Sequence, residues 1–157
     1  MIVTCARFVV AVRKPVAHHN AIMDYQFSAQ ISVRWKDVDS FQVVNNAVYF
    51  TMIEQTRFEY FEHLGLLRDG NFPFVVGETS CRYLQPARLG MQLKVQAAVH
   101  RLGNKSFEMN FEIYNGTQLL TQANSTLVWV DEALKAADIP ADARQGISKF
   151  EGIPDHG

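Results

Sequence analysis

Residues 33–46 read VRWKDVDSFQVVNN, and this stretch joins two different hydrophobic patterns. The residues before it alternate between apolar and polar, whereas the residues after it repeat with the period of a helix. Two acids, Asp37 and Asp39, lie on the short turn between the two patterns. Backbone N–H groups at the start of a helix are unpaired and electropositive. An acid beside such a helix start forms a pair that can attack and polarise a carbonyl group.

Apolar and polar residues alternate without a break over residues 26–35. The apolar members of this pattern are Phe27, Ala29, Ile31, Val33 and Trp35. A period of two over this length predicts a β-strand with one buried face, on which these five side chains point inward.

Residues 46–64 repeat with the period of an α-helix. One stripe consists of Tyr49, Met52, Ile53, Thr56, Tyr60 and Leu64, and much of the opposite side consists of Phe50, Phe58 and Phe61. A helix that is apolar nearly all round is expected to be buried nearly all round. Gly65 is a suitable residue to end it. Glu54 and Arg57 lie one helical turn apart, so we expect them to form an ion pair on the remaining polar strip.

Strands dominate the rest of the pattern. We predict them at residues 72–84, 91–102, 106–114 and 118–130, with hairpin turns at Gly103-Asn104 and Asn115-Gly116. Short hairpins imply an antiparallel meander. One antiparallel sheet and one apolar helix bury each other when the sheet wraps around the helix. The predicted fold class is therefore α+β, an antiparallel sheet of about five strands wrapped around one long buried helix. The open sheet edges favour pairing between copies of the chain.

The chain divides into three parts on the basis of these patterns. Residues 1–22 are expected to be a loosely ordered N-terminal extension, residues 23–131 the domain, and residues 132–157 a C-terminal tail. The tail is expected to be irregular, with at most a short helical extension at residues 133–137. The residues that interrupt it are Pro140, Gly146, Gly152 and Pro154.

Composition excludes several classes of protein. The 157 residues suit one domain, and the formal net charge of -1 gives no basic surplus for binding nucleic acid. No run approaches the roughly 18 apolar residues needed to span a bilayer. Cys5 and Cys81 match no zinc-binding spacing and suggest no disulfide framework, so we expect no metal and a cytoplasmic location.

The order of the elements and the motif between them resemble the hot-dog fold, and specifically the 4-hydroxybenzoyl-CoA thioesterase-like family. The matching residues are Arg34-Trp35-Lys36-Asp37-Val38-Asp39, Val44-Asn45-Asn46, Tyr49, Glu54, Arg57, Cys81-Arg82-Tyr83-Leu84, Pro86-Ala87-Arg88, Leu102-Gly103, Ser106-Phe107 and Val128-Trp129-Val130. The resemblance covers roughly residues 25–131. One departure is that Gln42-Val43 stands where such proteins commonly carry Gly-His, and Gln42 makes a turn with positive φ less free than glycine would.

The resemblance implies hydrolysis of an acyl-CoA thioester without a cofactor. It implies that Asp39 is the catalytic acid, acting as a nucleophile or as a general base for water, and that a backbone N–H near Asn46 holds the thioester oxygen. From the residues alone, capping of the turn or helix is the favoured role for Asp39, and the resemblance reverses that order. For Asp37 we favour a structural role, as a cap or as a partner of Arg34 or Lys36.

Substrate contacts are predicted at several further residues. Asn45 and Tyr49 lie at the helix start. Asparagine is common at such a position, so a substrate contact is a secondary role for Asn45. Coenzyme A carries phosphates, which require basic groups. The candidates are Arg82, Arg88, Arg101 and Lys105. Lys105, in a hairpin turn, is the first choice among them, and a lysine that is merely solvated in its turn is at least as good an interpretation. The aromatic helix face is either plain core or the wall of an acyl tunnel. A role for Glu54 as a second acid acting on water is less favoured than its pairing with Arg57.

Three functions remain open at this point. The leading hypothesis is a cytoplasmic acyl-CoA thioesterase that forms a homodimer or homotetramer. The second is an acyl-carrier-protein thioesterase, which shares the chemistry but recognises a protein. The third is a non-catalytic acyl-CoA-binding protein, which gains weight from the missing Gly-His pair. A hydratase is disfavoured because no histidine lies near the helix start.

Overall fold

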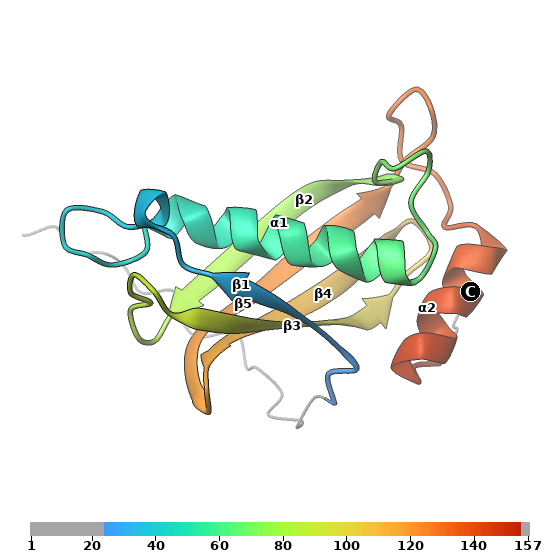
Figure 1. Ribbon diagram of the computed structural model, residues 1–157. Helices are drawn as coiled ribbons and strands as arrows, with labels where there is room; N and C mark the ends of the chain where they lie inside the picture. The colour runs from blue at the N-terminus through green and yellow to red at the C-terminus, as the bar shows by residue number, and fades with distance from the viewer. Residues whose placement is uncertain (1–23, 155–157) are drawn as a thin grey trace, which may run out of the picture.

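The computed structural model describes residues 24–154, and the predicted N-terminal extension lies outside them. The elements are β1 (Phe27–Ser32), the 3₁₀-helix η1 (Trp35–Asp37), α1 (Asn46–His63), β2 (Phe74–Tyr83), β3 (Gln92–Leu102), β4 (Ser106–Asn115), β5 (Gln118–Trp129) and α2 (Ala141–Glu151). Figure 1 shows α1 lying across one face of the sheet, as the α+β prediction requires. No helix within residues 24–154 is long and apolar enough to cross a membrane.

The five strands form one sheet in the order β1-β3-β4-β5-β2, and every neighbouring pair is antiparallel. The two predicted hairpins join β3 to β4 and β4 to β5. The meander is incomplete, however, because β2 pairs with β5 and not with β3, which follows it in the chain. As a result, β1 and β2 are the two edge strands, and the segment between β2 and β3 crosses from one side of the sheet to the other.

The core lies between α1 and the sheet. Strand β4 alternates strictly, and its inward side chains Phe107, Met109, Phe111 and Ile113 are all buried. The predicted helical stripe meets them, with Tyr49, Met52, Ile53, Thr56 and Tyr60 buried. Burial of one large apolar side chain contributes roughly 1.5–3 kcal/mol, so this layer is the main source of stability.

Three expectations for side chains in this layer are wrong. Trp35 is 79% exposed, because β1 ends at Ser32 and Trp35 is the first residue of η1. The outer face of α1 is open in the single chain, where Phe50 is 42% exposed. Glu54 and Arg57 do not approach within ion-pair distance. Arg57 is instead buried, and it donates to Oγ of Ser125 at 3.2 Å.

The irregular tail predicted after Asp131 is wrong for its second half, which forms α2. Ala143 and Ile147 on this helix are buried against the core. The Glu151 carboxylate at its end accepts from the hydroxyl of Tyr60 at 2.5 Å and from the backbone N–H of Val99 at 2.8 Å. The short helix suggested at residues 133–137 is also wrong, because that segment is a turn.

Candidate active site

The loop that carries the two acids is a short two-stranded ladder. The N–H of Asn45 donates to the carbonyl of Asp37 at 2.9 Å, and the N–H of Asp39 donates to the carbonyl of Val43 at 2.9 Å. An isolated bridge between residues 38 and 44 lies between these two bonds. The ladder therefore holds Asp37 next to the start of α1 and Asp39 nearer the tip of the loop, which extends beyond the end of the helix in Figure 1.

The Asp39 side chain closes the tip of this loop. Its Oδ1 atom accepts from the backbone N–H of Phe41 at 2.8 Å and, more weakly, from that of Val43 at 3.5 Å. Its Oδ2 atom makes no hydrogen bond to any residue that the structure describes. The turn-capping role and a chemical role are thus compatible, because one oxygen is fixed and the other is open.

The tip of the loop passes through a conformation that favours glycine. Gln42 has a φ of 61°, in the left-handed region, as the comparison with Gly-His at this position suggested. Its N–H donates to the carbonyl of Asp39 at 3.0 Å, which closes a tight turn. A side chain in this region costs roughly 1–2 kcal/mol. The turn therefore has a conformation that glycine adopts more readily, and Gln42 holds it under strain.

The helix start carries a backbone donor that has no partner within residues 24–154. Asn45 is the N-cap of α1, and its Oδ1 atom accepts from the N–H of Ala47 at 2.9 Å. The carbonyl of Asn45 accepts from the N–H of Val48 at 2.9 Å, which orients the peptide unit between Asn45 and Asn46. The N–H of Asn46 has no partner among the described residues. The neighbouring N–H of Ala47 is occupied by the cap, so among the described residues the N–H of Asn46 is the one near the helix start that can hold the thioester oxygen.

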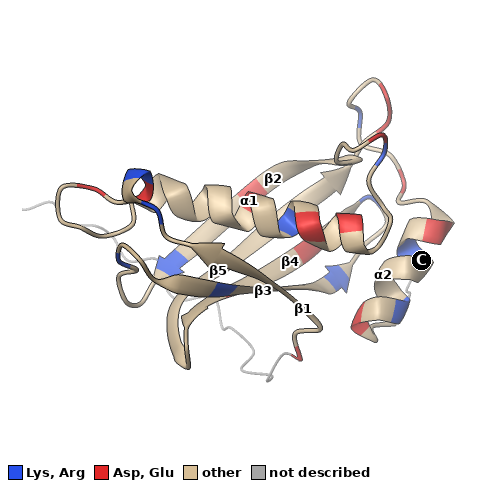
Figure 2. Ribbon diagram, in the orientation of Figure 1, with Lys and Arg blue, Asp and Glu red and all other residues tan. Residues whose placement is uncertain are grey.

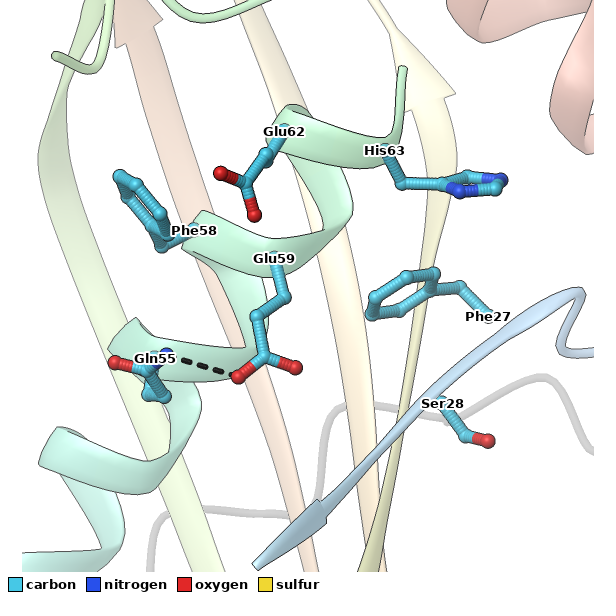
Figure 3. Close-up of a pocket in the computed structure, with 7 residues that line it drawn as sticks. All are labelled: Phe27, Ser28, Gln55, Phe58, Glu59, Glu62 and His63. Atoms are coloured by element: carbon cyan, nitrogen blue, oxygen red, sulfur yellow. Dashed lines mark hydrogen bonds between the residues drawn. The ribbon is translucent and has the colours of Figure 1, made fainter. Parts of the chain in front are cut away.

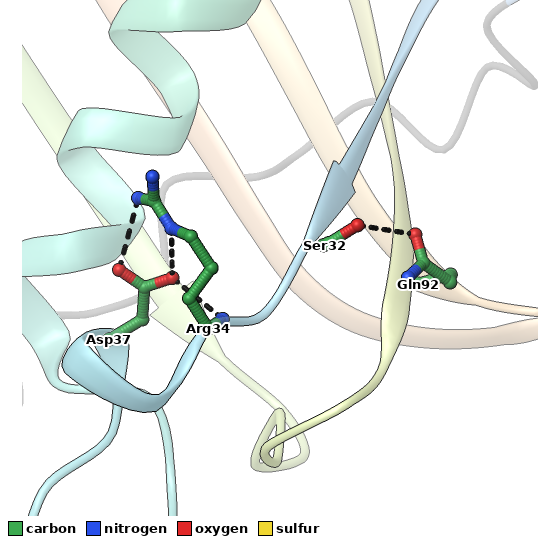
Figure 4. A network of polar contacts seen from close by, with 4 residues as sticks. All are labelled: Ser32, Arg34, Asp37 and Gln92. Atoms are coloured by element: carbon green, nitrogen blue, oxygen red, sulfur yellow. Dashed lines mark hydrogen bonds and ion pairs between the residues drawn. The ribbon is translucent and has the colours of Figure 1, made fainter.

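Asp37 is engaged elsewhere, as Figure 4 shows. Its Oδ2 atom accepts from the backbone N–H of Arg34 at 2.9 Å and from Nε of the same residue at 3.0 Å, and its Oδ1 atom accepts from the second guanidinium nitrogen at 3.2 Å. These bonds from Arg34 lower the pKa of the Asp37 carboxyl below its ordinary value. The predicted structural role of Asp37 is therefore confirmed.

The segment after β2 braces the other side of the loop. Val44 donates to the carbonyl of Ala87 at 2.9 Å, and Arg88 forms a bridge with Val43. The N–H of Ala87 in turn donates to the hydroxyl of Tyr49 at 3.1 Å. Arg88 thus lies beside the loop. Tyr49 is only 2% exposed, and it supports the loop from the side of the core.

Sequence reasoning overlooked Tyr83 as a member of this site. Its hydroxyl donates to the carbonyl of Asn46 at 3.3 Å, and its ring packs edge-on against Tyr49. The only signal in the sequence was its place in the matched Cys81-Arg82-Tyr83-Leu84 segment. The contact depends on β2 and α1 meeting in space, which no local pattern reveals.

Lys105 is not brought to the loop within one chain. It lies in the turn between β3 and β4, whereas the loop adjoins the other end of β3, where Val33 donates to the carbonyl of Met91 at 2.9 Å. Its Nζ atom is 3.8 Å from Oδ1 of Asp138. Both side chains are largely exposed, so this ion pair contributes little to stability.

A surface groove of about 620 Å³ lies on the opposite half of α1 from the loop. Figure 3 shows the residues that line it, which are Phe27, Ser28, Gln55, Phe58, Glu59, Glu62 and His63. Figure 2 shows that this half of α1 carries several acids. The groove contains none of the predicted site residues. Residues 24–154 also contain no group of three His, Cys, Asp or Glu side chains placed to hold a metal ion.

Comparison with known proteins agrees with this arrangement. Residues 33–147 match the model of the Thioesterase-like superfamily. The chain is 27% identical over 128 residues to the chloroplastic acyl-acyl carrier protein thioesterase ATL3 of Arabidopsis thaliana, covering 77% of this chain and 65% of that protein. It therefore spans slightly less than two thirds of the length of this plant relative. It is 27% identical over 127 residues to the long-chain acyl-CoA thioesterase FadM of Escherichia coli, covering 77% of this chain and 96% of that protein.

A similar structure has also been solved. It is a thioesterase from Thermus thermophilus in complex with coenzyme A and zinc, with a TM-score of 0.76 and 29% identity, covering 83% of this chain and 97% of that one. The family match begins at Val33, directly after β1, and extends through α1 and strands β2 to β5 into α2. The chain therefore belongs to the Thioesterase-like superfamily, and the predicted hot-dog fold is confirmed.

Proposed function

We propose that the protein is an acyl-CoA thioesterase, which hydrolyses an acyl-CoA thioester to the free acid and coenzyme A. The observation that carries this proposal is that the loop and the helix start that follows it each carry one polar group without a partner among residues 24–154. These groups are the free Oδ2 atom of Asp39 and the unpartnered N–H of Asn46. Membership of the superfamily and the likeness to FadM support the reaction class.

Asp39 acts in one of two ways. As a nucleophile, its carboxylate attacks the thioester carbon, the C–S bond breaks, and coenzyme A leaves as a thiolate that takes up a proton. Water then hydrolyses the mixed anhydride to regenerate Asp39 and release the acid. As a general base, Asp39 instead takes a proton from the attacking water. Both routes need an open carboxylate oxygen, and Oδ2 supplies it.

The N–H of Asn46 stabilises the oxygen that becomes negative during either route. This amide is held by the helix that begins there, so it needs no rearrangement as charge develops. The positive end of the helix dipole adds to the effect. Loss of one such donor in other enzymes costs about 100- to 1,000-fold in rate, which is the size of contribution we assign to it.

Recognition of coenzyme A is assigned to the basic groups nearest the loop. Arg88 is exposed beside Val43 and is the first candidate for a phosphate contact. Lys105 contributes only if a second copy of the chain brings it to the loop. The open edge of β2, where Val75 and Val76 are 42% and 49% exposed, supports the proposed homodimer or homotetramer. Asn45 and Tyr49 contribute chiefly by holding the helix start and the loop.

The deciding experiment compares Asp39→Asn with Asp131→Asn across a panel of acyl-CoA substrates. Asp131 is a matched control, because its Oδ1 atom also caps a turn by accepting from the N–H groups of Ala133 and Lys135, both at 2.9 Å. Asp39→Asn should lower thiol release by at least about 100-fold with little change in folding. Asp131→Asn should leave thiol release unchanged. Equal activity in the two variants would refute the assignment of Asp39.

An acyl-carrier-protein substrate is the second candidate, favoured by the likeness to the plant acyl-acyl carrier protein thioesterase. Rates measured on the same acyl group attached to coenzyme A and to an acyl carrier protein separate the two proposals. If the enzyme prefers the carrier protein, substrate recognition would be assigned to a wider surface that contacts this protein, and not to Arg88 alone. Saturable binding of acyl-CoA without thiol release would instead indicate the non-catalytic alternative.

A further inference from the structure

Tyr83, the last residue of β2, connects the edge of the sheet to the first turn of α1. Its hydroxyl donates to the carbonyl of Asn46 at 3.3 Å. Its ring meets that of Tyr49 edge-on, with 5.0 Å between the ring centroids and 60° between the planes. Tyr49 is buried, whereas Tyr83 is 40% exposed. Tyr83 is thus braced by a core residue on one side and open to solvent on the other.

The carbonyl that Tyr83 contacts is part of a longer chain of hydrogen bonds. It belongs to the same peptide unit as the N–H of Ala47, and that N–H donates to Oδ1 of Asn45 at 2.9 Å. Each bond in such a chain polarises the next one. The first turn of a helix has the fewest backbone bonds of its own, so an external contact restrains it more than it would restrain a later turn.

We propose that Tyr83 is a positioning residue, which holds the first turn of α1 so that the N–H of Asn46 remains aimed at the thioester oxygen. This role rests on the proposed thioesterase reaction. A donor stabilises the developing negative charge only while it is aligned with the oxygen, so small movements of the helix start reduce the rate. Tyr83 acts through Asn46, and in this role it touches neither the substrate nor Asp39.

The protonation of Tyr83 agrees with a donor role. Burial of part of the ring, with a smaller contribution from Cys81, raises the pKa of Tyr83 to about 12. The hydroxyl therefore keeps its proton throughout the pH range in which thioesters are assayed. The contact to Asn46 does not depend on pH within that range.

Tyr83→Phe removes the hydroxyl and keeps the ring. The matched control is Tyr114→Phe on β4, where the hydroxyl donates to Glu112 at 2.7 Å. We expect Tyr83→Phe to lower kcat by about 3- to 10-fold with KM unchanged, the effect of one modest hydrogen bond. Tyr114→Phe should change neither constant. A loss confined to KM, or an equal loss in Tyr114→Phe, overturns the proposal.

A spectroscopic measurement separates positioning from a merely structural role. In the Asp39→Asn background, the C=O stretch of a bound acyl-CoA thioester reports the strength of the hydrogen bond from Asn46. Adding Tyr83→Phe should move this frequency toward that of the free thioester, whereas simple loss of stability would leave it in place. If Tyr83→Phe does not fold, Tyr83→Leu, which also lacks a donor, tests the same prediction. Absence of thiol release in the wild type would refute the proposed function, whereas an unmoved frequency refutes the role of Tyr83.

Discussion

Arg34 binds both oxygens of Asp37, and its own backbone N–H adds a third bond to the same carboxylate. This contact separates the two acids of the loop into different roles. Asp37 is 3% exposed and fully engaged, whereas Asp39 two residues later keeps one oxygen open. The Arg34–Asp37 pair fixes the base of the ladder on which Asp39 is presented.

Replacing Asp37 should therefore weaken the fold in a pH-dependent way. Bonds from Arg34 hold the pKa of Asp37 below 3.8, so its contribution is fully present above that pH and is lost as the pH falls through the lowered value. Asp37→Asn should reduce the free energy of unfolding by about 1 kcal/mol at pH 7. Urea titrations of both proteins should converge in acid. A difference that does not shrink as the pH falls would contradict the ion pair as its cause.

Gln42 should be replaceable by glycine with a gain in stability. Its φ of 61° strains any side chain, and glycine removes that strain although it costs entropy in the unfolded chain. We expect Gln42→Gly to raise the free energy of unfolding by about 0.5–1 kcal/mol. Ser40→Gly is the matched control on the same loop, because Ser40 has no positive φ, and it should lower stability. Loss of stability in both variants would show that the side chain of Gln42 contributes more than its backbone costs.

The elements that could be predicted from the sequence are those with a regular hydrophobic period. Strict alternation in β4 and the helical stripe of α1 located these elements to within a few residues. Helix α2 was missed because Pro140, Gly146 and Gly152 resemble breakers. In the structure Pro140 precedes the helix, Gly152 ends it with a φ of 65°, and Gly146 lies within it. The apolar spacing of Ala143, Ile147 and Phe150 was the signal that would have revealed this helix.

The candidate site was predictable only where it is local. That Asp39 lies on the loop leading into α1 follows from their closeness in the sequence. The sequence does not reveal which amide is free, because that depends on whether the Asn45 side chain turns toward Ala47. The contribution of Tyr83 depends on the pairing of β2 with β5, which places β2 at the sheet edge beside α1. Long-range pairing of this kind leaves no periodic signal.

The carboxylate of Glu151 should make stability fall as the pH rises above the acid range. Burial raises its pKa above the ordinary 4.5, against the effect of the bonds from Tyr60 and Val99. A raised pKa means that the protonated group fits the fold, so its contribution is present at low pH and is lost as the pH rises through the raised value. Glu151→Gln keeps an acceptor for both bonds and should remove this slope. Unfolding measured from pH 4 to pH 8 tests it, with exposed Glu132→Gln as the control that keeps the slope.

Substitutions of Asn45 should separate the effect of the helix start on stability from its effect on the rate of the reaction. Asn45→Asp preserves the cap on Ala47 and adds a negative charge near the positive end of the helix dipole. It should therefore keep or raise stability, by about 0.3–1 kcal/mol. The same charge lies one residue from Asn46, where the thioester oxygen becomes negative, so it should lower kcat several-fold by repulsion.

Asn45→Ala should behave in the opposite manner. It removes the cap, which costs about 1 kcal/mol of stability, and it frees the N–H of Ala47 without adding charge. The loss of kcat should then be smaller than in Asn45→Asp, although the protein is less stable. Thermal unfolding and thiol release measured on both variants give the comparison. If activity followed stability across the pair, the electrostatic role of the helix start in the reaction would be excluded.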